Sequence, residues 1–169
     1  MTAMLLGSIM VPDIANPRPE DVDVMFMRFR LREIRRFSGH PAAITVYEHQ
    51  QLCGRIAREM GFGDEVVLWA RHHDDHEYAT GDIPSPLQIA MGSGYLGVLQ
   101  ERWDVAICGA LGIPVPTLEV RGAVSVVDRV ARGLEWRHCL GRDVGELGLS
   151  DGVLPYVDGL GHLIAEVRP

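Results

Sequence analysis

Apolar residues recur at helical spacing through residues 118–139, and this periodicity limits the chain to helical architectures. The positions that share one face are Val124, Val127, Ala131 and Leu134. Asp128 lies at the edge of that face, so its carboxylate needs a partner once the face is buried. Strand signals are sparse elsewhere in the sequence. We therefore expect an all-α fold in which helices pack as a bundle.

Several other segments carry helix signals. A helix is expected over residues 19–37, because proline and acidic residues form its first turn. A capping box at Thr45 predicts the start of a second helix, and Asp64 caps a third. Residues 81–86 contain two prolines and predict a rigid turn, after which residues 94–111 are expected to be helical.

The length of 169 residues and the 47% hydrophobic content predict one domain with a substantial core. Residues 1–17 are expected to form an irregular leader that ends at Asn16-Pro17, and residues 18–140 the folded domain. Residues 141–169 are rich in glycine and weak in periodicity. We expect them to form a loose tail packed on the same domain, with one short element around residues 163–167.

The charge of the chain restricts its ligands. The net charge is −7, which disfavours binding to a nucleic-acid polymer but leaves free nucleotides as candidates. All 16 basic side chains are arginine. The absence of lysine from the sequence excludes Schiff-base chemistry and a phosphate-binding P-loop lysine. A bound phosphate is therefore expected to contact arginine, backbone N–H groups or a metal.

The apolar segment over residues 4–11 is too short to span a bilayer and lacks a positively charged flank. We expect neither a signal peptide nor a membrane anchor, and a cytoplasmic location. Cys53, Cys108 and Cys139 are odd in number, widely separated and placed in apolar stretches. They are interpreted as reduced core residues.

Residue types that commonly bind metals occur on three of the expected helices. His49 is on the apolar face of the second helix, His73 and Asp74 are near the end of the third, and Asp128 is in residues 118–139. Two imidazoles and two carboxylates suit a divalent transition metal such as Zn, Mn, Co, Fe or Ni. Such a metal with an open position can polarise a phosphoryl oxygen, which indicates hydrolysis of a phosphoester.

The order His49, His73-Asp74, Asp128 resembles the ligand pattern of the HD-domain metal-dependent phosphohydrolases. Three longer strings resemble the subgroup that contains the 5'-deoxynucleotidases and the phage deoxyadenosine triphosphate triphosphohydrolases. They are RFxGH at 36–40, TVxEH at 45–49 and HDxxExxxGDIPxPL at 73–87. The similarity covers residues 18–140 and implies an HD-domain helical bundle in which these four side chains bind the metal.

The resemblance also implies roles for other side chains. Glu77 matches the catalytic acid or base of the family, and Asp82 matches a second carboxylate near the sugar and the scissile phosphate. Arg36 is expected to bind a phosphate oxygen. Phe37 is expected to pack on the sugar or base, where an apolar ring favours deoxyribose.

The activity implied is hydrolysis of a free deoxynucleotide, with the release of triphosphate from a purine deoxynucleoside triphosphate such as dATP as the leading expectation. A 5'-deoxynucleotidase acting on monophosphates is the alternative, and a hydrolase of alarmones or cyclic nucleotides ranks third. A non-catalytic nucleotide- or metal-sensing module is the alternative from another class. Retention of Glu77 and Asp82 favours an enzyme, since a sensor needs no proton-transfer groups. The other expected ligands and partners are a small-molecule nucleotide, additional divalent ions bound with its phosphates, and further copies of the chain in a homo-oligomer.

Two departures from the family pattern affect the phosphate pocket. Asp75 and His76 stand where the family usually has small apolar residues, and Gln88 stands where lysine is frequent. His72 and His76 are expected to be exposed, because their helical positions face away from His73. Trp136 is interpreted as a core aromatic residue.

Overall fold

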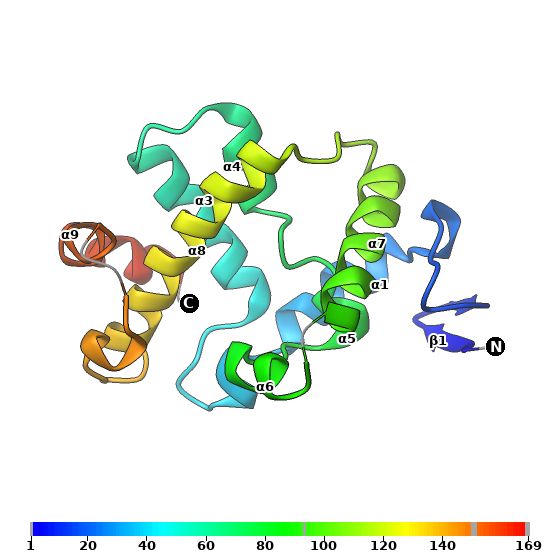
Figure 1. Cartoon of the computed structure of the whole chain (residues 1–169), viewed down its shortest axis with the longest axis horizontal. Coiled ribbons are helices and arrows are strands. Elements are labelled where there is room, and N and C mark those ends of the chain that lie inside the picture. Colours follow the sequence, from blue (N-terminus) through cyan, green and yellow to red (C-terminus); the bar gives the residue numbers. More distant parts are fainter. Residues whose placement is uncertain (1, 93, 150–151, 168–169) are drawn as a thin grey trace.

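The computed structural model describes residues 2–92, 94–149 and 152–167, and helices dominate this part of the chain (Figure 1). The α-helices are α1 (Val24–Glu33), α2 (Arg36–Gly39), α3 (Val46–Glu59), α4 (Asp64–Ala70), α5 (Glu77–Thr80), α6 (Ser85–Ala90), α7 (Gly94–Leu111), α8 (Leu118–His138) and α9 (Leu154–Gly159). Short 3-10 helices are η1 (Pro19–Asp21), η2 (Val144–Leu147) and η3 (Gly161–Glu166), and the strands are β1 (Met4–Leu6) and β2 (Ile9–Val11). The prediction of an all-α fold is confirmed in this described part.

Helices α3, α4 and α8 pack against one another at the centre of the molecule. The capping box that begins α3 is confirmed, since Thr45 accepts a hydrogen bond from the Glu48 backbone N–H and Glu48 accepts one from that of Thr45. The apolar faces of α3 and α8 meet in a core that includes the fully buried Leu52, Val127 and Leu134. This core fixes the relative positions of the two helices.

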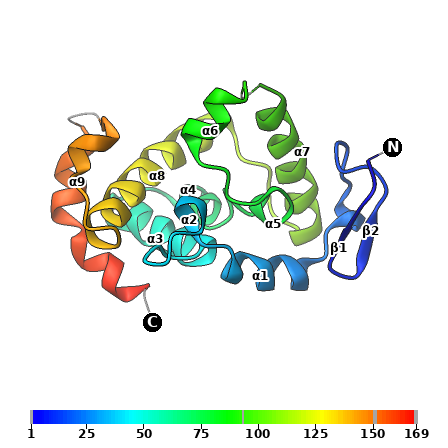
Figure 2. The ribbon, with the colours of Figure 1, turned by 90° about the horizontal axis from the view of Figure 1, so that it is seen from below.

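A second apolar cluster joins α1, α7 and the N-terminal hairpin. Met27 and Leu31 of α1 are buried in it, and the Trp103 ring of α7 makes an edge contact with Tyr78 at 5.5 Å between ring centroids. Figure 2 shows the hairpin and the C-terminal helices at opposite ends of the molecule. Among the described helices, none is both long enough and apolar enough to cross a membrane.

The expected helix over residues 19–37 is wrong at both ends, because α1 begins only at Val24, after the separate 3-10 turn η1. Helix α1 ends at Glu33, and Ile34 is extended. The Ile34 carbonyl accepts a hydrogen bond from the Val46 N–H, and the Arg36 N–H donates to the Ile44 carbonyl. This strand-like pairing with the segment before α3 replaces the helical hydrogen bonds and brings Arg36 to the N-terminal end of α3.

The N-terminal leader is not irregular, because β1 and β2 pair as an antiparallel hairpin with Leu5 opposite Met10. Gly7 occupies the turn with a φ of 62°, which is accessible to glycine without strain. Leu6 and Val11 are buried against the second cluster. The hairpin therefore has an apolar face that holds it on the domain.

The C-terminal tail is more ordered than its glycine content indicates. Segments η2, α9 and η3 all contact α8, and η3 also contacts α3. Val157, Leu163 and Ile164 are buried in the main core. The tail contacts α8 and α3 through several short helices instead of the one short element expected around residues 163–167.

Candidate metal centre

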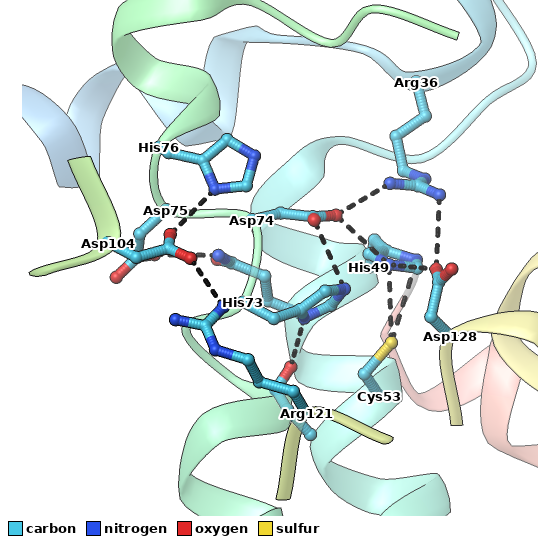
Figure 3. Close-up of polar contacts among 12 residues, drawn as sticks. Arg36, His49, Cys53, His73, Asp74, Asp75, His76, Asp104, Arg121 and Asp128 are labelled. Carbon is cyan, nitrogen blue, oxygen red and sulfur yellow. Dashed lines mark hydrogen bonds and ion pairs between the residues drawn. The ribbon is translucent and has the colours of Figure 1, made fainter. Parts of the chain in front are cut away.

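Four side chains from three parts of the chain converge on one another (Figure 3). His49 comes from α3, Asp128 from α8, and His73 with Asp74 from the segment after α4. His49 Nε2 lies 3.2 Å from Asp128 Oδ1 and 3.5 Å from Asp74 Oδ2. His73 Nε2 lies 3.3 Å from Asp74 Oδ1, and the two imidazole centroids are 5.3 Å apart. The four predicted metal ligands are therefore together.

A break in the helix positions two of these ligands. The expected third helix does not run through to Glu77, because α4 ends at Ala70 and α5 begins at Glu77. Residues 71–76 form consecutive turns. In a continuous helix, neighbouring residues point about 100° apart. The turns instead allow His73 and the adjacent Asp74 to face the same point.

Both histidines are oriented through Nδ1. His49 Nδ1–H donates to Glu135, and His73 Nδ1–H donates to the Ala70 carbonyl at 3.0 Å. In the neutral imidazole, the form that binds a metal, Nε2 is then the atom that supplies the lone pair. His73 Nε2 is buried and has no hydrogen-bond partner in the described part of the chain. An Nδ1 contact that aims an Nε2 lone pair is the usual arrangement of a metal-binding histidine, so these residues fit a divalent metal.

Cys53 lies directly beside the cluster. Its Sγ atom is 3.4 Å from His49 Nε2, and the side chain is fully buried and not in a disulfide. Burial raises the pKa of the Cys53 thiol to about 11. Since the thiolate is the form that binds metals, the nitrogen and carboxylate donors remain the better ligand set.

Glu135 was not singled out in the sequence, although it belongs to the site. Its carboxylate is fully buried on α8 and accepts hydrogen bonds from His49 and from Arg36 Nε, the latter at 3.0 Å. Arg36 also lies 3.1 Å from Asp74 and 3.8 Å from Asp128. Burial alone raises the pKa of Glu135 and of Asp128, but Arg36 and His49 outweigh it and lower both. Glu135 lies seven residues after Asp128, a spacing that places both on one helical face.

Glu77 and Asp82 lie next to this cluster with one carboxylate oxygen each unsatisfied. Within the residues that the structure describes, Glu77 Oε2 and Asp82 Oδ2 are buried and without a hydrogen-bond partner. Burial and the nearby Asp74 raise the pKa of Glu77 well above its ordinary value. Burial also raises the pKa of Asp82, although Arg36 opposes the shift. Both groups hold a proton more readily than an exposed carboxyl group.

A cleft of about 650 Å³ opens over these residues. Arg36 and Phe37 line it, and Arg132 and Trp136 of α8 line it as well. The Phe37 and Trp136 rings are 5.6 Å apart, so Trp136 is a half-buried wall of the cleft and not a core residue. Arg132 Nε is buried and unpaired among the described groups. The sequence carried no motif for Arg132 or Trp136, but each follows Asp128 by a spacing that keeps it on a neighbouring face of α8.

The expected exposure of His72 and His76 is wrong. His76 is 8% exposed, and its Nδ1–H donates to Asp104 at 2.9 Å. Asp104 is held in turn by Arg121 at 3.0 Å (Figure 3). His72 is half-buried and donates to the buried Asp75 at 2.7 Å. The departure from the helix over residues 71–76 turns both imidazoles into the protein.

No protein-family model matches the chain. The chain is similar to an uncharacterized protein of the bacterium Rhodobacter capsulatus. The two are 29% identical over 152 residues, which cover 84% of this chain and 77% of the relative. The similarity therefore extends across most of both proteins.

Proposed function

We propose that the protein is a metal-dependent phosphohydrolase of the HD-domain type that acts on a free deoxynucleotide. The observation that carries the proposal is the convergence of His49, His73, Asp74 and Asp128, with both histidines oriented through Nδ1. The cleft beside them is within the size range of small-molecule sites. These four side chains would hold one divalent metal, which supplies Lewis-acid polarisation of a phosphoryl oxygen when bound.

The two arginines that line the cleft provide contacts for phosphate oxygens. Arg132 Nε has no other partner within the described residues, so a phosphate oxygen satisfies a buried donor. Arg36 carries donors on the side of the metal ligands and neutralises developing negative charge there. Arginine is the only basic side chain available for this role other than histidine, because the sequence has no lysine.

Glu77 and Asp82 are the candidate proton-transfer groups. Burial and Asp74 raise the pKa of Glu77, which suits this group to deliver a proton to the leaving oxygen. Asp82 is less buried and orients the attacking water. Both carboxylates line the cleft within reach of the same substrate. A metal- or nucleotide-sensing module needs ligands but no proton-transfer groups.

The wall formed by Phe37 and Trp136 supports a nucleoside substrate. Two aromatic rings offer stacking area for a base and an apolar surface against a sugar carbon. An apolar contact at C2' favours deoxyribose over ribose because a 2'-hydroxyl group there loses its hydrogen bonds. The resemblance of the sequence to the phage enzymes makes a purine deoxynucleoside triphosphate such as dATP the first substrate to examine.

A specific observation also favours the 5'-deoxynucleotidase alternative. Gln88, at the position where the family often has lysine, donates its side-chain amide to the Ile83 carbonyl at 2.6 Å. Because glutamine is neutral, this position adds no positive charge to the cleft. A monophosphate carries less negative charge than a triphosphate and needs fewer cationic contacts.

The test is to strip the protein of metal, resupply Mn²⁺ or Co²⁺, and incubate it with ribo- and deoxynucleoside mono- and triphosphates. Triphosphate released from a deoxynucleoside triphosphate supports the leading proposal, and phosphate released only from deoxynucleoside monophosphates supports the alternative. Substitution of the exposed His162 by alanine is the matched control for His73→Ala, which is expected to abolish turnover. Absence of turnover with every metal and nucleotide would contradict the enzymatic proposal.

A further inference from the structure

A second group of potential metal ligands adjoins the first. Ligand atoms of Asp74, His76 and Glu77 all lie within 4.8 Å of one another. The three side chains line the same cleft, and the last two are buried to more than nine-tenths. Asp74 also approaches both imidazoles of the first group, so it stands between the two groups.

His76 is prepared as a ligand in the same way as His49. Its Nδ1–H donates to the buried Asp104, which Arg121 holds from the other side. The Nε2 atom is then the one with a free lone pair. Figure 3 shows one nitrogen of the His76 ring directed at Asp104 and the other pointing away from it. A carboxylate behind a histidine commonly fixes the tautomer and the ring orientation of a metal ligand.

Glu77 supplies an independent observation. Its Oε2 atom is buried, and no described residue offers it a hydrogen bond. A buried carboxylate oxygen without a donor costs free energy unless a cation or a proton satisfies it. Since Glu77 lies beside Asp74, a cation between the two stabilises both carboxylates at once.

The excess of negative charge in the cleft also favours a bound cation. The carboxylates of Asp74, Glu77, Asp82 and Asp128 line the cleft. Acidic side chains outnumber the basic ones along its described walls, where Arg36 and Arg132 are the arginines. Arg36 is already paired with carboxylates at the first group. A cleft of this charge repels a phosphate group unless metal ions reverse the local potential.

We infer that Asp74, His76 and Glu77 form a second divalent-cation site, with Asp74 shared between the two ions. The inference rests on the proposed first metal site, because a shared ligand requires both. Paired ions about 3.5–4 Å apart are a known arrangement for phosphoester hydrolysis, in which they stabilise the attacking and leaving oxygens together. With Glu77 bound to the second ion, Asp82 is the carboxylate left to accept or deliver a proton.

The experiment counts Mn²⁺ ions on the full-length protein. Metal-free protein is equilibrated with Mn²⁺ at increasing concentration, bound ions are counted by mass spectrometry, and electron paramagnetic resonance reports whether they are coupled. We expect two ions per chain and a spin-coupled signal. His76→Ala is expected to retain one ion with an uncoupled signal, and that retained ion shows that the variant is folded. His162→Ala, which changes an exposed histidine, is expected to retain both ions.

A second variant avoids truncating a buried side chain. Asp104→Asn preserves the shape of the residue but removes the charge behind His76. It is expected to lower the affinity for the second ion about 10- to 100-fold and to leave the affinity for the first unchanged. A single ion on the unmodified protein, unaffected by His76→Ala, overturns the second site and leaves the proposed first centre intact. Absence of any bound ion overturns both.

Discussion

Glu135 accepts a hydrogen bond from Nδ1 of His49, and both side chains are completely buried. The contact determines which nitrogen of His49 faces Asp74 and Asp128. Glu135 is thus a positioning residue. Its negative charge also increases the basicity of the imidazole, which strengthens binding of a metal at Nε2.

Replacing the Glu135 carboxylate by an amide tests its effect on His49 without changing the packing of the core. Glu135→Gln is expected to fold, because the amide is similar in size and its carbonyl can still accept a hydrogen bond. Metal affinity is expected to fall about 10- to 100-fold, as calorimetric titration with Mn²⁺ can measure. Glu101→Gln, an exposed change on α7, is the control and should bind metal like the unmodified chain. Equal affinity for the two variants contradicts the positioning role.

Metal binding is expected to raise the thermal stability of the protein. A ligand at 100 times its dissociation constant stabilises a folded protein by about 2.7 kcal/mol. For a chain of this length, that corresponds to a rise in Tm of about 5–10 °C. Differential scanning calorimetry with and without Mn²⁺ measures the change, and a chelator should reverse it. Asp128→Asn should remove most of the rise, so a rise that persists in this variant places the metal elsewhere.

Glu77 is expected to contribute to turnover more than to folding or to the first metal site. Glu77→Gln removes a carboxylate that serves as a proton-transfer group at a one-metal site or as a ligand at the inferred second ion, and in either role the change should lower kcat about 10²- to 10⁴-fold. The ion held by His49, His73, Asp74 and Asp128 should remain bound. Steady-state kinetics with the best nucleotide and a metal count on the same sample test both statements. Glu65→Gln, exposed on α4, serves as the control, and unchanged kcat in Glu77→Gln shows that turnover does not need the Glu77 carboxylate.

Arg36 is expected to matter most for stability when the metal is absent. Its guanidinium group pairs with Asp74 and Glu135, so Arg36→Ala leaves buried carboxylates without a cation. Losing one partner of a buried ion pair typically costs about 3–5 kcal/mol. A bound metal replaces part of the lost positive charge, and the loss should then be smaller. Urea unfolding with and without Mn²⁺ measures the difference in the free energy of unfolding. The control is Arg58→Ala, an exposed change on α3, which should lower the free energy of unfolding equally little under both conditions.

The segment after Arg36 is expected to be strained. Phe37 and Ser38 have φ angles of 54° and 57°, in the left-handed region that costs non-glycine residues about 1–2 kcal/mol each. Ser38→Gly relieves this cost but increases the conformational freedom of the unfolded chain. The free energy of unfolding is therefore expected to rise by about 0–1 kcal/mol. Ser125→Gly, in the interior of α8, should instead lose about 0.5–1 kcal/mol. Urea unfolding of both variants checks the opposite signs, and a loss in Ser38→Gly shows that the turn is not strained.

The long helices could be predicted closely because their signals are local. Residues 94–111 match α7, and α8 begins and ends within one residue of the expected range. The break after Ala70 could not be predicted, since helical spacing continues through His73 and Glu77 and neither glycine nor proline interrupts it. Long-range contacts, such as that of His76 with Asp104, compete with the local preference for a helix.

The same distinction applies to the candidate site. The four predicted metal ligands, Arg36 and Phe37 followed from residue types and a motif. The structure brings the four predicted ligands together, and Arg36, Phe37, Asp74 and Asp128 line the adjacent cleft. The roles of Glu135 and His76 depend on partners 86 and 28 residues away in the chain. Separations of that size leave no periodic pattern in a single sequence. The seven-residue spacing from Asp128 to Glu135 was the available signal, and it becomes meaningful only when α8 is known to be a helix.

Helix α8 places Asp128 and Glu135 against His49 and also packs against α9, η2 and η3. A side chain such as Val157, which is buried in the C-terminal segment, touches none of the ligands but helps to hold the backbone from which they project. Substitutions far from the candidate site can therefore displace the proposed metal ligands as surely as a substitution of one of them removes it. The folding of a variant that lacks activity should therefore be measured before the substituted residue is named as catalytic.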